Sequence, residues 1–384
     1  MNLLQIAWVA GLLVCGMGVA LLGSVKVSLA RRLEMDEARV GGLVSMFGFA
    51  MIPVMLGMGF LTDFLDKKLV VLGGCLLITS SLIVLAFARR YATALLSVLL
   101  LSAGWSGVVN VLNVLMQAAF GGSPTYAMNL GNFFFGLGAF LTPLFIAFLS
   151  KRAGFVKTLF VLGGVALLPG LLAFGVDFAA LAGPPSKQAG PGIGVLLTDP
   201  IMWLTALALL FYAPMEATMG AWTTTYLSDK RASETLASAM LSTFWLAFTI
   251  ARLGTALLVA AFPLTAGGTG WLIVGLAVFC LLVWLGAVIS PNRGMACAMV
   301  VLAGIAFGPT FPTIVGVLTG HVDPAVAGRA VGLFFMIGGI GWSLIPILIG
   351  AYARRAGVQR AFLIAVGAGV GLTATALALR SFML

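Results

Sequence analysis

The residues of this sequence that are best suited to chemistry are two charged side chains inside apolar segments. Glu216 lies within an apolar run from Pro200 to Leu227, which is long enough to cross a bilayer as a helix. Arg252 is the one basic residue well inside such a run. An ionised side chain at that depth costs about 3 kcal/mol on insertion scales, so these residues usually face a cavity or a partner. We therefore expect both to line a functional interior of a membrane protein.

The chemistry open to Glu216 depends on whether Arg252 neutralises it. With a rise of about 1.5 Å per residue, Glu216 lies about 24 Å into its helix and Arg252 about 12 Å from the same side, which disfavours direct pairing. An unpaired Glu216 could bind and release a proton, as a proton-coupled carrier must. The alternative is a glutamate that stays protonated and hydrogen-bonds its neighbours. Tyr212 and Gly220 share its helix face, so this polar stripe should line an interior.

Amide side chains gather on two further apolar segments. Asn110, Asn113 and Gln117 follow one another at helical spacing, and Asn129 and Asn132 share one face of the next segment. With almost no charge nearby, these amides suit a neutral hydrogen-bonding ligand such as a sugar, although polar side chains also hold membrane helices together. Aromatic residues could stack on a sugar ring or simply pack. The candidate substrate-binding residues are Asn110, Asn113, Gln117, Asn129, Asn132, Tyr212, Trp222, Trp245 and Arg252.

The composition excludes most other classes of function. Of 384 residues, 61% are hydrophobic and 8% are charged, with a mean hydropathy of +1.16, which indicates an all-α integral membrane protein. The one histidine, His321, is expected to be solvated at a helix end, and this leaves little acid/base machinery for an enzyme. The four cysteines stand singly and the sequence has no phosphate-binding loop, so we expect no metal, no cofactor and no ATP hydrolysis. The net charge of +10 is spread over short loops, so the expected partners are the lipid bilayer and a small solute rather than nucleic acid, and we expect a monomer.

The apolar runs predict twelve transmembrane helices with one long interruption. The interruption is rich in proline and glycine, and it predicts a six-helix bundle over 1–178, a central loop over 179–199 and a second six-helix bundle over 200–384. Pro309 and Pro312 should break the tenth helix. The expected helices span 3–25, 40–61, 69–88, 92–116, 126–149, 156–176, 200–227, 236–261, 270–289, 295–318, 329–350 and 361–380.

An internal repeat supports the division into two pseudo-symmetric halves. The segment 136–143 matches 339–346, and 151–157 matches 354–360, each 203 residues later. Copies that point the same way need an even number of helices each, and six per half fits. Parallel repeats of this kind place a substrate site near the midplane of the membrane, where the halves meet.

With these features the sequence resembles the major facilitator superfamily, and within it the fucose-permease-like sugar transporters. The loop after the second helix is similar to the family's gating motif, although Phe64 and Asp66 replace its arginine and its second glycine. The positions that match the gating motif are Gly59, Asp63, Lys67 and Lys68.

Other helices carry the resemblance through most of the chain. The segments 129–136, 249–252 and 304–313 resemble the fifth, eighth and tenth helices of the subgroup. Its seventh-helix pattern is similar to Tyr212, Glu216, Gly220, Trp222 and Tyr226. The resemblance implies the major facilitator fold, transport by alternating access and a cytoplasmic location for both termini.

Loop charges argue for the opposite orientation. Loops after odd-numbered helices hold fifteen basic residues and the other side holds five, so the positive-inside rule would place the odd-numbered loops in the cytoplasm. We follow the resemblance and expect a multi-pass protein of the plasma membrane, such as a bacterial inner membrane, with both termini cytoplasmic.

The sequence therefore favours a secondary active transporter that moves a small, mostly neutral, sugar-like solute by alternating access, with Glu216 as the candidate proton-coupling residue. The alternative is an exporter of amphipathic drugs or metabolites, which the many apolar residues allow. The solute, the direction of transport and the coupling ion stay open.

Overall fold

The computed structural model describes residues 2–178, 181 and 192–383. Eleven of its helices are long and apolar enough to cross a membrane. One of them, α6 (Pro124–Ala173), contains two spans, because Gly154 interrupts its 50 residues with φ 79° and ψ 166°. The described residues therefore have the all-α architecture that the apolar runs predict, with twelve segments long and apolar enough to span a membrane.

Two compact units make up the chain. The start of α14 (Ala327–Ala356) belongs to the first unit although it lies late in the sequence, and the start of α6 belongs to the second unit although it lies early. The predicted central loop falls largely on positions 179–180 and 182–191, which lie outside the described residues, so the division at 179–199 stays a prediction. The first unit contains Met1–Gly121, Phe134–Val195 and Val322–Met336; the second contains Gly122–Phe133, Leu196–His321 and Ile337–Leu384.

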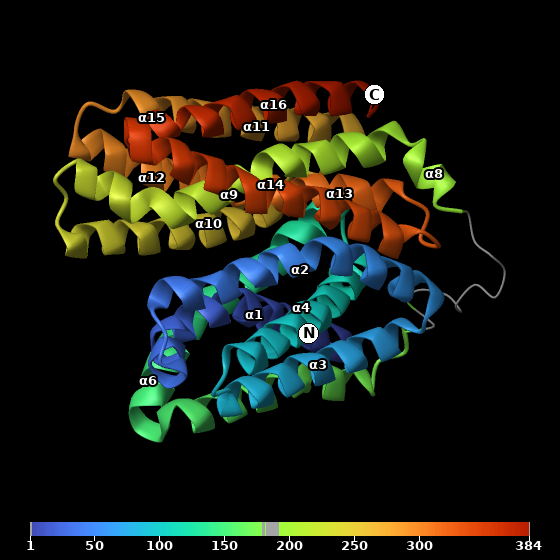
Figure 1. Ribbon diagram of the computed structural model, residues 1–384. Coiled ribbons are helices and arrows are strands. Elements are labelled where there is room, and N and C mark those ends of the chain that lie inside the picture. The colour runs from blue at the N-terminus through green and yellow to red at the C-terminus, as the bar shows by residue number, and fades with distance from the viewer. Residues whose placement is uncertain (1, 179–180, 182–191, 384) are drawn as a thin grey trace. The chain divides into compact units, whose positions relative to one another are not determined.

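In the first unit the long helices run alongside one another (Figure 1). Indole groups join the first and fourth: Trp105 Nε1 donates to the Cys15 carbonyl at 2.7 Å, and Trp8 Nε1 donates to the Leu112 carbonyl at 3.2 Å. These bonds satisfy buried donors inside an apolar interface. The helices of this unit, besides parts of α6 and α14, are α1 (Leu3–Leu33), α2 (Glu37–Phe64), α3 (Lys67–Phe87), α4 (Tyr91–Val114) and α5 (Met116–Phe120).

In the second unit α9 is the central element, since it packs against α10, α13 and α16. The helix begins where Asp199 accepts hydrogen bonds from the amides of Ile201 and Met202, directly before the helix-compatible Pro200. The helices here, besides the start of α6, are the end of α8 (Gly194–Leu197), α9 (Pro200–Asp229), α10 (Glu234–Ala261), α11 (Ala266–Ile289), α12 (Arg293–Phe307), α13 (Thr310–His321), the greater part of α14 (Ala327–Ala356), α15 (Val358–Ala361) and α16 (Leu363–Ser381).

The first helix is longer than expected. The apolar run predicts a first helix that ends at residue 25 and leaves Lys26, Arg31 and Arg32 in the following loop, but these residues lie within α1. The helix ends only where Glu34 takes a left-handed conformation with φ 53°. Long basic side chains tolerate such positions because their stems pack on apolar surface while the charge reaches polar surroundings.

The internal repeat is visible in the backbone. Gly154 and Gly357, which the repeat aligns, have nearly the same left-handed conformation, with φ 79° and 82°. Upstream of each, a glycine lets two helices meet: a Cβ on Gly138 would strike the carbonyl of Leu13, and one on Gly341 would strike that of Leu210. The two sequence copies therefore share a helix bend and a close helix contact.

Candidate functional site

The site is organised around a break in the tenth membrane-spanning segment. The segment divides into α12 and α13 at Gly308 and Pro309, as predicted from its prolines. Pro312 has no N–H, so it cannot donate to the carbonyl of Gly308 one helical turn earlier. The break leaves main-chain carbonyls free to accept hydrogen bonds from neighbouring helices.

Arg252 on α10 donates to the Gly308 carbonyl, which Pro312 leaves without a helix donor. Its Nε donates to Gly308 O at 2.9 Å, and its Nη1 donates to Asn132 O at 3.0 Å. The guanidinium carbon also lies 4.1 Å from the centroid of the Phe248 ring, within cation–π range. With only 3% of its surface exposed, Arg252 is held by carbonyl dipoles and an aromatic face.

Tyr212 on α9 donates to the adjacent carbonyl, that of Phe307. Its hydroxyl lies 2.7 Å from Phe307 O and 2.7 Å from Oε2 of Glu216, one turn further along α9. Tyr212 is fully enclosed, whereas Glu216 keeps part of its surface exposed. The acid and the phenol thus form a polar centre next to the helix break.

Glu216 and Arg252 form no ion pair among the residues that the structure describes, in agreement with their expected difference in depth. The two residues are nonetheless parts of one site, because Tyr212 and Arg252 donate to consecutive carbonyls of the same break. The sequence could not show that the two residues share one site. Depth along a helix gives the position of each Cα, but not how far its side chain reaches toward another helix.

Asn129 and Asn132 lie at the start of α6, in the same unit as this break. Asn129 Nδ2 donates to Thr313 Oγ1 at 3.2 Å and to the Thr125 carbonyl at 3.0 Å. Asn132 Nδ2 donates to the Met128 carbonyl at 2.9 Å, and its own carbonyl accepts from Arg252. Asn129 therefore holds two segments together, while its buried Oδ1 has no hydrogen-bond partner within the described chain.

The amides of α4 belong to the first unit. Asn110 Nδ2 donates to Gly328 O at 3.1 Å, and Asn113 Nδ2 donates to Val109 O at 2.8 Å. The Oδ1 atoms of both are buried without a partner in the described part of the chain. Gln117 does not continue this face as expected, because α4 ends at Val114 and Gln117 lies exposed in the short α5.

The two tryptophan candidates for solute binding, Trp245 and Trp222, lie in different surroundings. Trp245 packs edge to face on Phe244 and Phe248, at centroid distances of 4.8 and 5.4 Å, and it lies over Gly220 of α9. Trp222 packs over Gly350 of α14 instead. Trp245 is therefore part of the aromatic wall beside Arg252, and Trp222 contacts another helix.

The matched gating residues meet the start of α14 inside the first unit. Asp63 accepts hydrogen bonds from the amides of Gly328 and Arg329, at 2.7 and 3.0 Å, and from Arg329 Nε at 2.7 Å. Free amides of a first helical turn favour an anion at this place. Gly59 lies so close to the Gly328 carbonyl that a Cβ would clash. Lys67 and Lys68 begin α3, where Lys68 Nζ donates to the Phe174 carbonyl at 3.0 Å.

Sequence reasoning missed Arg329, which was counted only as a loop charge. Its guanidinium carbon lies 5.2 Å from the ring centroid of Phe64, the residue that replaces the arginine of the gating motif. A departure from the motif at Phe64 was the available signal that a cation from elsewhere fills this place. The carbonyls of Phe307 and Gly308 were also missed, because a main-chain acceptor leaves no mark on the residue type.

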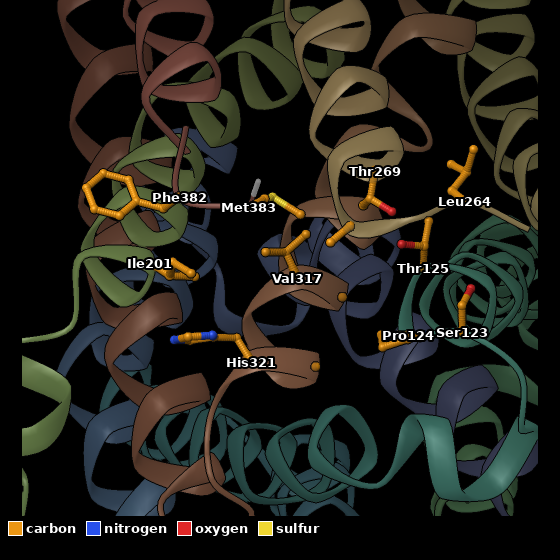
Figure 2. A pocket seen from close by; sticks show the side chains of 13 residues that line it. Ser123, Pro124, Thr125, Ile201, Leu264, Thr269, Val317, His321, Phe382 and Met383 are labelled. Atoms are coloured by element: carbon orange, nitrogen blue, oxygen red, sulfur yellow. The ribbon is translucent and has the colours of Figure 1, made fainter. Parts of the chain in front are cut away.

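A separate hollow of about 400 Å³ lies among helix ends of the second unit. Its lining combines hydroxyls with apolar side chains, and His321 lies at its edge (Figure 2). His321 Nε2 lies 2.8 Å from Oδ2 of Asp199, so the imidazole joins the end of α13 to the start of α9. The residues of the helix break are not in this lining: it is formed by Ser123, Pro124, Thr125, Ile201, Leu264, Ala266, Thr269, Gly316, Val317, Gly320, His321, Phe382 and Met383.

Solved structures share this fold. FucP, a transporter crystallised in an outward conformation, superposes with a TM-score of 0.80 and 16% identity over 97% of this chain and 98% of that one. A second structure, of the E. coli fucose:proton symporter FucP, gives a TM-score of 0.79 at 16% identity, covering 97% of this chain and 98% of that one. The human organic anion transporter MFSD10 (TETRAN) gives 0.76 at 16% identity, covering 97% and 99%. At this identity the likeness concerns the fold.

One curated relative is similar over part of its length. The yeast (Saccharomyces cerevisiae) "Bypass of stop codon protein 6" is 28% identical over 183 residues, which are 45% of this chain and 36% of the yeast protein. The aligned region thus spans about a third of that relative.

The family is settled by a match along most of the sequence. The family model described as Major Facilitator Superfamily matches residues 8–346. This agrees with the twelve spans and the repeated helix bend. The chain therefore belongs to the Major Facilitator Superfamily, and it is a multi-pass membrane transporter of a small-molecule solute rather than an enzyme.

Proposed function

We propose that this transporter moves a small, mostly neutral, sugar-like solute by alternating access and couples this movement to protons through Glu216. The observation that carries the coupling is the position of one phenol between two acceptors, Phe307 O and Glu216 Oε2. A phenol has one proton to donate, and a carbonyl can only accept.

The number of protons available to these three groups links the hydrogen bonds of Tyr212 to the protonation state of Glu216. If Tyr212 donates to Phe307 O, the second 2.7 Å contact needs a proton on Glu216, which then donates to the phenol oxygen. If Glu216 is ionised, Tyr212 can donate to it and must leave the carbonyl. The centre thus accommodates both states of the acid, and the exposed part of Glu216 offers a path for the proton to enter and leave.

The amides support a hydroxyl-rich solute. Asn110, Asn113 and Asn129 each keep a buried amide oxygen without a hydrogen-bond partner within the described chain. Such oxygens are acceptors suited to sugar hydroxyls, and exposing them by a change of conformation would remove the penalty of leaving them unpaired. The fold neighbour FucP is a fucose:proton symporter, and its substrate agrees with this class.

One observation favours the second candidate, an exporter of amphipathic drugs or metabolites. Within the described residues Arg252 has no carboxylate partner, and Phe248 and Trp245 form an apolar wall beside it. A solute with a charged and an apolar part would fit such a wall, and the fold neighbour MFSD10 is an organic anion transporter. Competition by simple sugars supports the first candidate, whereas competition by lipophilic anions or dyes supports the second.

The test is solute-driven proton movement in proteoliposomes that contain a pH-sensitive dye. Sugars, polyols and amphipathic anions are screened against the wild type and Glu216→Gln. We expect one class of solute to carry protons in the wild type, and Glu216→Gln to abolish proton-driven accumulation while solute exchange continues, because the amide cannot release a proton.

The matched control is Glu234→Gln, which alters an exposed glutamate in the first turn of α10. This variant should accumulate solute like the wild type. Undiminished accumulation by Glu216→Gln would remove Glu216 from the coupling role. A solute that exchanges without any proton movement would make the protein a uniporter or an exchanger.

We also propose that the protein lies in the plasma membrane, such as a bacterial inner membrane, with both termini cytoplasmic, and that the two six-helix halves, 1–178 and 200–384, rock about the solute. The repeated bends at Gly154 and Gly357 support two equivalent halves.

A further inference from the structure

The hydroxyl of Tyr212 is the side-chain group that joins α9 to the carbonyl of Phe307 at the end of α12. Tyr212 was a candidate for solute binding, but its hydroxyl is enclosed and both of its contacts are internal. Its ring also stands edge to face against the ring of Phe307, at a centroid distance of 6.4 Å. These contacts fix the phenol so that a small rotation of its O–H exchanges one acceptor for the other.

The competition between the two acceptors depends on the charge of Glu216. A hydrogen bond to an ionised carboxylate is roughly twice as strong as one to a neutral acceptor. Ionised Glu216 therefore takes the proton of Tyr212 away from the Phe307 carbonyl. Protonated Glu216 instead donates to the phenol oxygen, and the phenol returns to the carbonyl.

We propose that Tyr212 is a positioning residue that transmits the proton state of Glu216 to the break between α12 and α13. When Glu216 is protonated, the Tyr212 hydroxyl donates to Phe307 O and so links α9 to the break; we call this hydrogen bond the tie. When Glu216 loses its proton, the hydroxyl donates to Glu216 instead and the tie is lost. The O–H bond of Glu216 is the one that breaks, its proton leaves to water, and Tyr212 keeps its own proton throughout. The proposal rests on the proposed role of Glu216 and specifies how that role reaches the break between α12 and α13.

The surroundings suit such a switch. Within the described chain, the groups that act electrostatically on the Tyr212 and Glu216 pair are Arg252 on α10 and the thiol of Cys280 on α11. Arg252 stays bound to the next carbonyl, Gly308 O, so the break remains anchored on one side when the phenol lets go. The break is already weak because Pro309 and Pro312 cannot donate helix hydrogen bonds.

Hydrogen–deuterium exchange of segment 307–313 in lipid nanodiscs, at an acidic and an alkaline pH and without solute, tests the proposal. After correction for intrinsic exchange, wild-type protection should fall on the order of 3- to 10-fold at alkaline pH, the factor that one net hydrogen bond supplies. Tyr212→Phe keeps the ring and should show the low protection at both pH values. Glu216→Gln can still donate to the phenol and should show the high protection at both.

The matched control is Tyr226→Phe. Tyr226 is another enclosed tyrosine of α9; its hydroxyl donates to the carbonyl of Ala287 at 2.9 Å and has no carboxylate partner among the described residues. Its removal should leave the pH dependence of segment 307–313 intact. Because the two phenylalanine variants lose equivalent bonds, a general loss of stability would affect both.

The outcomes separate the two proposals. pH-independent protection in the wild type, or unchanged pH dependence in Tyr212→Phe, would overturn the tie even if Glu216→Gln abolishes proton-driven accumulation. The expected pH dependence together with no proton movement during transport would leave the tie in place and overturn the coupling role of Glu216.

Discussion

At Asp63 one carboxylate accepts three hydrogen bonds from the first turn of α14. The side chains of Asp63 and Arg329 are only 1% and 5% exposed. Burying two charges is offset only while each has the other as a partner. The pair is thus a strong link within the first unit, but one that a single substitution can break.

We predict that Asp63→Leu destabilises the protein by about 3–5 kcal/mol, because it leaves the Arg329 guanidinium buried and unpaired. The double variant with Arg329→Leu should recover part of this loss. Denaturant titration of the purified protein in detergent measures the free energy of unfolding of the single and the double variant. Asp66→Asn, which weakens only the exposed cap of α3, should cost about 1 kcal/mol or less. Strict additivity of the two leucine substitutions would show that the charges are not coupled.

The sequence identified the charged side chains of the site but not their partners. Glu216 and Arg252 were found because charge inside apolar sequence is rare and costly. Their partners are the main-chain carbonyls of Phe307 and Gly308. Every residue of the chain has such a carbonyl, so the sequence does not single these two out. Proline spacing showed that some carbonyls would be free, but only the packing of α9, α10 and α12 shows which side chains reach them.

At the scale of elements, the break between α12 and α13 was predictable and the bounds of other helices were less so. Pro309 and Pro312 dictate the break through missing donors. The extension of α1 to Leu33 passes three basic residues that resemble a loop in the sequence. The end of α4 at Val114 separates Gln117 from Asn113 in a segment without proline, where no residue type marks the turn.

We predict that Pro312→Ala slows transport. The new N–H can donate to Gly308 O, so α12 and α13 become more continuous and compete with Arg252 for this carbonyl. A helix interior gains up to about 3 kcal/mol when proline is replaced by alanine. Solute exchange by proteoliposomes should fall, and exchange of deuterium into segment 308–313 should slow. Pro143→Ala, inside α6, is the control and should leave segment 308–313 unchanged; faster transport by Pro312→Ala would contradict the role of the break.

At the scale of the whole molecule, apolar run lengths and the repeat were sufficient to predict an all-α fold with twelve spans, because a run of about 20 apolar residues crosses a bilayer as a helix that satisfies its own backbone hydrogen bonds. Orientation is different, since loop charge and family resemblance point in opposite directions. A charge bias is a statistical preference of insertion, so it decides orientation less firmly than it indicates that a membrane is crossed.

Single cysteines can establish the orientation. Ser228 and Ser381 are exposed at the ends of α9 and α16, on opposite sides of the membrane in a twelve-helix topology. In a background without the four native cysteines, an impermeant thiol reagent added to whole cells should modify Ser228→Cys and not Ser381→Cys. Permeabilised cells should show both sites modified. Modification of Ser381→Cys alone in intact cells would show that the loop charges, and not the resemblance, give the orientation.

The matched bends at Gly154 and Gly357 also bear on the history of the molecule. A positive-φ glycine at the same place in both copies is what the duplication of one segment, with its backbone bend, would leave. The chemistry of the two copies differs: the later copy holds Glu216 and Arg252, whereas Leu13 and Phe49 stand 203 residues before them in the earlier copy. The two halves thus share backbone geometry, but Glu216 and Arg252 have apolar residues at the aligned positions of the first half.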